Sequence, residues 1–178
     1  MPDRYHRQSL LAELHGTPHE ELKRSRAMIV GCGALGCAIA ESLTRAGVAH
    51  LTIVDRDVVE LTNLQRQSLF IEADAEEAKP KAIAARTRLE QINSEIEINA
   101  VVDHFSSVNA RAITDIARPG VILDGTDNFQ TRYLLNDLAI DRGIPFIYAG
   151  AVAMQATTAV IRPGRTPCLR CLEPDPPV

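Results

Sequence analysis

Short apolar runs alternate with segments of helical periodicity along most of the chain, and this alternation limits the folds that the chain can adopt. The runs are nearly continuous in Val, Ile, Leu and Ala, which is typical of parallel strands buried on both faces. Strands are expected over residues 27–31, 50–55, 97–103, 121–128 (running into a loop), 145–153 and 156–164. Helices are expected over residues 19–25, 34–47, 79–93, 109–117 and 129–143. The pattern predicts an α/β fold, a doubly wound, Rossmann-like and mostly parallel sheet with helices on both faces.

The last expected strand follows its predecessor without room for a helix, so the end of the sheet is expected to include an antiparallel strand. In sheets of this kind, ligands bind beyond the carboxyl ends of the strands, where the strand order changes. The segments that follow strands are therefore the ones to examine. They are residues 31–36, 55–67 and 124–129.

A glycine-rich turn, GCGALG at residues 31–36, stands between an expected strand and an expected helix. Gly31 permits a tight turn, Gly33 lets the backbone approach a ligand, and Gly36 lets the helix pack on the sheet. The helix that follows offers unpaired N–H groups and the positive end of its dipole to an anion. These features are typical of a nucleotide-binding turn.

An acidic residue supports this interpretation. Asp55 ends the second expected strand, nineteen residues after Gly36, where a carboxylate accepts hydrogen bonds from ribose hydroxyls. The turn and the acid predict an adenosine-type ligand, but they do not distinguish NAD from ATP. A chance glycine-rich turn is the alternative, and the strand, helix and acid at the expected spacing argue against it.

Positive charge further along the chain favours ATP. NLQRQ at residues 63–67 supplies Arg66, and KPK at residues 79–81 places a lysine at a helix start, where Pro80 fits well. A triphosphate carries more negative charge than a pyrophosphate and needs more cations. A lysine opposes the dipole at a helix start, a cost that phosphate would offset. A solvated, charged helix start is the alternative.

The segment DGTDN at residues 124–128 closes the fourth expected strand. Asp127 would lie beside the phosphates, where Mg²⁺ binds through one or two carboxylates together with phosphate oxygens. Asp127 could equally cap a helix that begins at Asn128 or Phe129, because Asp is a favoured N-cap residue.

The four cysteines do not form the framework of a small disulfide-rich domain. Cys32 and Cys37 belong to the glycine turn and the helix start, and are expected to be small buried residues. Cys168 and Cys171 form CLRC. Tetrahedral structural zinc needs four ligands, of which these two cysteines would supply two. A redox pair is the alternative, but the usual strand leading into a helix is missing here.

Charge and composition narrow the function further. Lys and Arg total 19 and Asp and Glu total 23, a net charge of −4, which argues against nucleic acid or an anionic membrane as the main partner. Residues 1–11 lack the apolar core of a signal peptide, and the uncharged run over residues 27–40 is too short to span a bilayer. The cytoplasm is therefore the expected location.

Seven motifs in one order resemble the ThiF/MoeB/HesA family, the bacterial relatives of ubiquitin-activating enzymes. They are RYHRQ (4–8), GCGALG (31–36), IVDRD (53–57), NLQRQ (63–67), KPK (79–81), DGTDNF (124–129) and PCLRC (167–171). The resemblance implies one ThiF-type adenylation domain over residues 1–178. It also implies an enzyme that uses ATP and Mg²⁺ to adenylate the C-terminal glycine of a ubiquitin-like sulfur-carrier protein, releasing pyrophosphate. Some members of the family adenylate a peptide instead.

The family's functional residues carry over onto matching positions. Asp55 would hold the ribose, and Arg66 and Lys81 would contact the phosphates, with Lys79 the weaker candidate. The nucleotide-binding residues implied by the resemblance are Gly31, Gly33, Ala34, Gly36, Asp55, Asn63, Arg66, Lys81, Asp127 and Asn128.

The implied catalytic residues are Arg7, Arg66, Lys81 and Asp127. Asp127 would bind Mg²⁺ near the α-phosphate, with Asn128 beside it. Arg7 would reach into the ATP site of a neighbouring subunit, which implies a homodimer. A solvated arginine near the chain terminus is the alternative.

The chain departs from the family pattern after the cysteine pair. Family members continue with a crossover segment, a second cysteine pair and further strands, so this chain is expected to be part of a longer protein. Zn²⁺ would then be bound by the whole protein, with Cys168 and Cys171 as half of its ligands. A shortened relative is the alternative.

Two other functions compete with adenylation. An NAD-dependent oxidoreductase would explain the glycine turn and Asp55, but it leaves NLQRQ, DGTDN and CLRC without a role. An ATP-binding pseudo-enzyme of the same fold is the non-enzymatic alternative. The carrier is not identified by the residues, since thiamine, molybdopterin, cysteine and peptide-modification pathways all use this scaffold.

Overall fold

The computed structural model describes residues 4–10 and 18–174 of the chain, and a six-stranded sheet in the order β3-β2-β1-β4-β5-β6 forms its centre. The strands are β1 (Arg26–Val30), β2 (His50–Val54), β3 (Glu97–Val101), β4 (Val121–Asp124), β5 (Phe146–Val152) and β6 (Gln155–Ile161). The first five are parallel, and β6 pairs antiparallel with β5. The α/β class, the mostly parallel sheet and the antiparallel last strand are thus confirmed.

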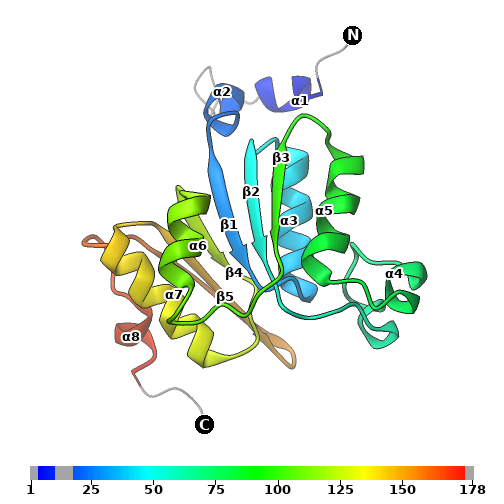
Figure 1. The fold of residues 1–178 in the computed structure, drawn as a ribbon. Coiled ribbons are helices and arrows are strands. Elements are labelled where there is room, and N and C mark those ends of the chain that lie inside the picture. The colour runs from blue at the N-terminus through cyan, green and yellow to red at the C-terminus, as the bar shows by residue number, and fades with distance from the viewer. Residues whose placement is uncertain (1–3, 11–17, 175–178) are drawn as a thin grey trace.

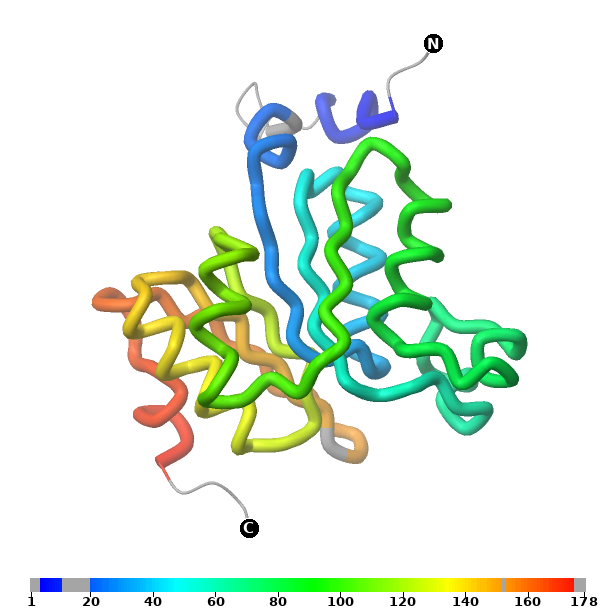
Figure 2. The backbone as a smooth tube through the Cα atoms, in the orientation of Figure 1, coloured from blue at the N-terminus to red at the C-terminus, as the bar shows by residue number. Residues whose placement is uncertain are grey.

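Helices cover both faces of this sheet (Figure 1). The helices are α1 (His6–Ser9), α2 (Pro18–Leu22), α3 (Ala34–Ala46), α4 (Glu72–Glu76), α5 (Lys81–Ile92), α6 (Ala110–Ala117), α7 (Phe129–Arg142) and α8 (Leu169–Leu172), with a 3-10 turn η2 (Leu61–Asn63). Helices α3 and α5 lie on one face of the sheet, and α6 and α7 lie on the other (Figure 2). Within residues 4–10 and 18–174, no helix combines the length and apolar content needed to cross a membrane.

The central strands β1 and β2 are mostly apolar because, after their first residue, they are buried on both faces. In β1, Ile29 packs in the layer of α3 and α5, while Met28 and Val30 pack in the layer of α6 and α7. In β2, Ile53 packs in the layer of α3 and α5, and Val54 packs in the layer of α6 and α7. Successive side chains of a strand point to opposite faces, so a parallel strand between two helical layers needs an apolar residue at every position.

Several element boundaries differ from those expected from the sequence. The helix expected over residues 19–25 ends at Leu22, because the N–H groups of Arg24 and Ser25 bond back to Glu21 and Leu22 before the chain enters β1. The fourth strand ends at Asp124, because the Asp124 carboxylate accepts the Thr126 N–H at 2.8 Å and turns the chain into the loop.

Four short helical elements, α1, η2, α4 and α8, were not expected. Two of them are local turns closed by a side chain. Asn63 Oδ1 accepts from the Glu60 N–H at η2, and Asp74 Oδ2 accepts from the Ile71 N–H at α4. Helix α8 is held through the fully buried Leu169. Such short elements have no useful periodicity, because tertiary contacts rather than propensity stabilise them.

The strand order changes between β1 and β4, and three glycines meet there. Gly31 has a φ of +89°, and a Cβ built on it would lie 2.6 Å from the Gly125 carbonyl carbon. A Cβ on Gly36 would lie 2.0 Å from the Gly31 oxygen, and one on Gly125 would lie 2.2 Å from the same atom. The backbones of the turn, of α3 and of the β4 loop are thus in direct contact, which only glycine permits. The contribution of Gly125 was not predicted.

Substitution of Gly36 by Ala is expected to lower the free energy of unfolding by about 3 kcal/mol or more, since the new methyl would overlap the Gly31 oxygen in a packed region. Gly143→Ala is the matched control. Gly143 also has a positive φ, +67°, but nothing lies within 4 Å of a Cβ there, so only conformational strain of about 1 kcal/mol is expected. Denaturant unfolding measures both; equal losses would contradict the proposed contact.

Candidate functional site

The first turn of α3 is open at the carboxyl edge of the sheet. Gly33 is its N-cap residue, Ala34 is its first helical residue, and no side chain of the described residues caps the turn. A Cβ on Gly33 would come no closer than 4.0 Å to any atom, the Gly125 oxygen. Gly33 therefore differs from Gly31 and Gly36, because the protein itself leaves space beside it. The unpaired N–H groups of the helix start can hold an anion in that space.

Asp55 links β2 to the glycine turn. Its Oδ2 accepts a hydrogen bond from the Cys32 N–H at 2.6 Å, and its Oδ1 accepts from the Asp57 N–H at 2.7 Å. Burial raises the pKa of this carboxyl group, while the two hydrogen bonds and the nearby positive charge of Lys81 oppose the increase. The carboxylate is thus fixed in orientation at the edge of the turn.

Lys81 is the first residue of α5, and only 7% of its surface is exposed. Its Nζ lies 3.2 Å from Asp57 Oδ2, and its N–H donates to the Asp57 carbonyl at 2.8 Å. Lys79 instead pairs with Asp74 at 3.4 Å. The structure therefore brings Lys81, rather than Lys79, to the loop that carries Asp55.

Asn63 and Arg66 lie in the following loop and are held locally. Asn63 is buried at the end of η2. Arg66 is exposed, and its Nη1 donates to the Thr62 carbonyl at 2.9 Å. No hydrogen bond or ion pair joins Arg66 to the described residues Asp55, Lys81 or Asp127.

Asp127 and Asn128 lie between β4 and α7. Asn128 is the N-cap residue of α7, and its Oδ1 accepts from the Thr131 N–H at 2.9 Å. The alternative role for Asp127 as the helix cap is therefore wrong, because Asn128 fills that role. The Asp127 carboxylate is exposed and touches only the Asn128 amide, at 3.5 Å, among the described residues.

Arg7 lies at the opposite edge of the sheet. It is an exposed residue of α1, which sits beyond the amino ends of the strands (Figure 1). Tyr5 anchors this segment, because it packs on Gly47 at the end of α3 and its hydroxyl accepts from Asn93 Nδ2 at 2.7 Å. The Asn93 amide also donates to the Thr44 carbonyl at 2.9 Å. Arg7 therefore cannot reach the glycine turn of its own chain.

The two cysteine pairs have different surroundings. Cys32 and Cys37 are fully buried with sulfur atoms 3.9 Å apart, and their mutual hydrogen bond, together with burial, raises the pKa of Cys32. They behave as the small buried residues that were expected. Cys168 and Cys171 are free thiols with sulfur atoms 3.8 Å apart, and Cys171 is exposed.

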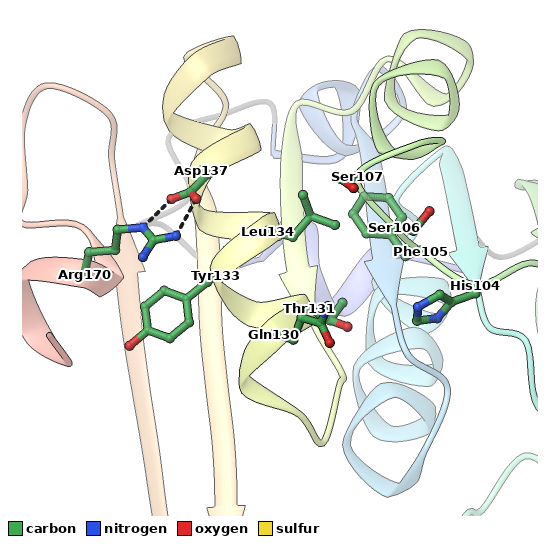
Figure 3. A pocket seen from close by; sticks show the side chains of 10 residues that line it. All are labelled: His104, Phe105, Ser106, Ser107, Gln130, Thr131, Tyr133, Leu134, Asp137 and Arg170. Atoms are coloured by element: carbon green, nitrogen blue, oxygen red, sulfur yellow. Dashed lines mark hydrogen bonds and ion pairs between the residues drawn. The ribbon is translucent and has the colours of Figure 1, made fainter. Parts of the chain in front are cut away.

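A cavity of about 380 Å³ opens near the carboxyl edge of the sheet, between α7 and the loop that follows β3 (Figure 3). Its lining residues are His104, Phe105, Ser106, Ser107, Gln130, Thr131, Tyr133, Leu134, Asp137 and Arg170. At its rim, Arg170 donates to both carboxylate oxygens of Asp137. The glycine turn does not line this cavity. The candidate nucleotide site is therefore the open edge beside the first turn of α3 rather than an enclosed pocket.

The sequence did not point to three charged residues at this edge. Asp57 holds Lys81, and Asp124 and Arg132 form a buried ion pair behind Asp127. One signal for Arg132 was available, since it is a charged residue in a helix segment whose neighbours Tyr133 and Leu135 are apolar and buried. A lone buried cation indicates a buried partner.

Comparison with known proteins gives the family. The model of the ThiF family matches residues 5–178. The chain belongs to the ThiF family. Among curated ThiF-family proteins, the sulfur carrier protein ThiS adenylyltransferase of Bacillus subtilis is 46% identical over 173 residues, which cover 97% of this chain and 51% of that protein. A sulfur carrier protein adenylyltransferase of Thermus thermophilus is 38% identical over 98% of this chain and 65% of that protein.

Solved structures agree with this assignment. Escherichia coli MccB, solved with AMPCPP and MccA, superposes with a TM-score of 0.85 at 26% identity, over 97% of this chain and 52% of that chain. MccB solved with ATP superposes with a TM-score of 0.84 at 27% identity, over 96% of this chain and 51% of that chain. The chain thus spans about half the length of the first of these relatives.

Substitution of Gly33 by Ala is expected to leave the free energy of unfolding within about 0.5 kcal/mol of the original value, since the added methyl meets no atom of the protein. ATP affinity should fall by about tenfold or more if the nucleotide occupies the space beside Gly33, a loss of about 1.4 kcal/mol. Calorimetric titration with ATP and denaturant unfolding measure the two quantities. Unchanged ATP affinity would place the nucleotide elsewhere.

Proposed function

We propose that the protein is an adenylyltransferase that activates the C-terminal glycine carboxylate of a small ubiquitin-like sulfur-carrier protein with ATP. The observation that carries this proposal is the arrangement at one sheet edge of an open helix start, the fixed carboxylate of Asp55, the buried Lys81 and the exposed Asp127. The similarity to sulfur-carrier adenylyltransferases supports the same conclusion.

The reaction suits these groups. A carboxylate oxygen of the carrier attacks the α-phosphorus, the bond from that phosphorus to the β-phosphate bridging oxygen breaks, and pyrophosphate leaves. The carboxylate is already ionised at neutral pH, so no general base is required. The difficulty is to bring two anions together and to stabilise charge on the phosphate oxygens, which positioned cations and N–H groups do.

Each group has a role in this scheme. The N–H groups at Gly33 and Ala34 would face the nucleotide, and Asp55 would accept from the ribose hydroxyls. Lys81 would neutralise phosphate charge, and its pairing with Asp57 keeps it in place until the nucleotide binds. Arg66 would turn from the Thr62 carbonyl towards the phosphates.

Two metal ions fit the residues to different degrees. An exposed carboxylate beside phosphate oxygens is a typical ligand of Mg²⁺, so Asp127 would hold Mg²⁺, which supplies positive charge to the α-phosphate region when bound.

Cys168 and Cys171 would hold Zn²⁺. Their sulfur atoms are 3.8 Å apart, which matches two thiolates on one tetrahedral zinc with Zn–S bonds of about 2.3 Å. In the described part of the chain, no group of three or more metal-ligating residues forms.

The position of Arg7 supports a homodimer. Because it lies at the sheet edge opposite its own nucleotide edge, it would act on the site of a second subunit. Tyr5 and Asn93 would hold this segment in place for that purpose. An arginine supplied from a partner adds charge at the phosphates only when the complex is assembled.

ATP–pyrophosphate exchange tests the function. Exchange is expected with ATP and a ubiquitin-like carrier that ends in Gly-Gly. Asp127→Ala is expected to reduce exchange by about 100-fold or more, since one charge-stabilising group is lost, while the melting temperature stays unchanged. Asp141→Ala is the matched control, because Asp141 is an exposed acid at the other end of α7.

The same assay separates the alternatives. Preference for NAD over ATP would refute the proposal in favour of an oxidoreductase. ATP binding without exchange by any carrier would indicate a pseudo-enzyme, and exchange only with a short peptide would change the substrate class. Near-normal exchange by Asp127→Ala would remove Asp127 from the metal site.

Mixing two inactive variants tests the dimer. Arg7→Ala and Asp127→Ala chains are each expected to be inactive, and a mixed dimer should regain about a quarter to a half of the activity, because one of its two sites is intact. Native mass spectrometry confirms the mixed species. A confirmed mixed dimer without activity would contradict the role of Arg7 across the interface.

A further inference from the structure

An ion pair lies buried directly behind the loop that carries Asp127. Asp124 ends β4 with none of its surface exposed, and Arg132 stands at the end of the first turn of α7 with 6% exposed. Arg132 Nε is 3.3 Å from Asp124 Oδ2. The residues of the pair lie on either side of the Gly125–Asn128 loop in the sequence, so the pair closes the base of this loop.

Both partners hold the same residue of the loop. Asp124 Oδ1 accepts from the Thr126 N–H at 2.8 Å and from the Thr126 hydroxyl at 2.7 Å. Arg132 Nη2 donates to the Thr126 carbonyl at 2.9 Å. The N–H, the hydroxyl and the carbonyl of Thr126 are thus all bound by the pair, and the next residue in the chain is Asp127.

The arginine itself cannot swing away. Its guanidinium lies 5.0 Å from the centre of the Phe129 ring and 5.5 Å from that of Tyr148. A Cβ on Gly150 would lie only 3.5 Å from the same guanidinium. Arg132 is therefore enclosed between the start of α7 and strand β5. On the other side of the loop, Gly125 is pressed against Gly31.

Fold stability alone does not account for this pair. A buried ion pair loses the hydration of both charges, and apolar residues of similar volume often stabilise a protein as well or better. Here Asp124 Oδ2 and Arg132 Nε lack a well-aligned hydrogen bond, so part of the desolvation cost is not recovered. What the charged pair provides, and an apolar pair would not, is a fixed path for the backbone on either side of Thr126.

We propose that Asp124 and Arg132 are positioning residues that fix the loop so that Asp127 is held ready for the metal ion. This inference rests on the proposed role of Asp127 in adenylation. Neither residue needs to touch the nucleotide or the carrier. They act through Thr126. Among the described residues, the Asp127 carboxylate touches only the Asn128 amide, at 3.5 Å. The path of the loop, rather than hydrogen bonds of the Asp127 side chain, therefore sets the position of this carboxylate.

The test compares Arg132→Met, Arg132→Lys and Asp124→Asn with the original protein. The Mg²⁺ concentration that gives half-maximal exchange should rise about tenfold or more in Arg132→Met, as when an outer-shell partner of a metal-binding carboxylate is lost. KM for ATP at saturating Mg²⁺ should change less than about twofold, because the pair does not contact the nucleotide. The Mg²⁺ concentration that Arg132→Lys needs should lie between those of the original protein and of Arg132→Met, since lysine keeps the charge but not the planar guanidinium.

Hydrogen exchange of peptides covering residues 125–134 gives a readout that does not need activity. Protection at Thr126 should fall in all three variants. Arg142→Met is the matched control, an arginine of the same helix that pairs with Asp115 instead, and it should leave both the Mg²⁺ dependence and the loop protection unchanged. If Arg132→Met does not fold, Asp124→Asn and Arg132→Lys carry the test.

The outcomes separate this inference from the proposed function. An original protein with no carrier-dependent exchange would refute adenylation, and the role of the pair in it would fall as well. Exchange by the original protein, with the same Mg²⁺ dependence and loop protection in every folded variant, would overturn the positioning role alone. A shift in Arg142→Met equal to that in Arg132→Met would also overturn it, since any change in α7 would then suffice.

Discussion

Close contact between the backbones of Gly31, Gly36 and Gly125 fixes the site, because it joins the glycine turn, helix α3 and the β4 loop at one point. The contact lies where the strand order changes, so loops from β1 and β4 meet there. The first turn of α3 and the carboxylate of Asp127 consequently open onto the same edge. With larger residues at these positions, the two loops would separate and the edge would lose its shape.

Charges at this edge divide into two kinds. Lys81, Asp124 and Arg132 are buried and paired, and their positions are set by the fold. Arg66 and Asp127 are exposed and make only local contacts among the described residues. A fixed inner set and an accessible outer set suit a reaction of highly charged substrates, since preorganised charges need little reorganisation when the ligand arrives.

Much of the fold could be predicted from the sequence, because it depends on local pattern. The apolar runs and helical periodicity identified the strands, the long helices and the antiparallel end of the sheet. The family was also recognised, while the roles of Asp55 and Lys81 at the glycine turn stay predictions. Gly125 and Arg132 were missed because their importance comes from contacts with residues distant in the sequence. Asp127 remained ambiguous until the structure placed Asn128 at the start of α7.

Helices α3 and α5 begin at the carboxyl edge of the sheet and end at the segment that carries Arg7. The 13 residues of α3 give a rod about 20 Å long. Asn93 joins the far ends of both rods, through the Thr44 carbonyl of α3 and the hydroxyl of Tyr5. The buried Asn93 side chain thus ties the far ends of α3 and α5 to the segment that carries Arg7.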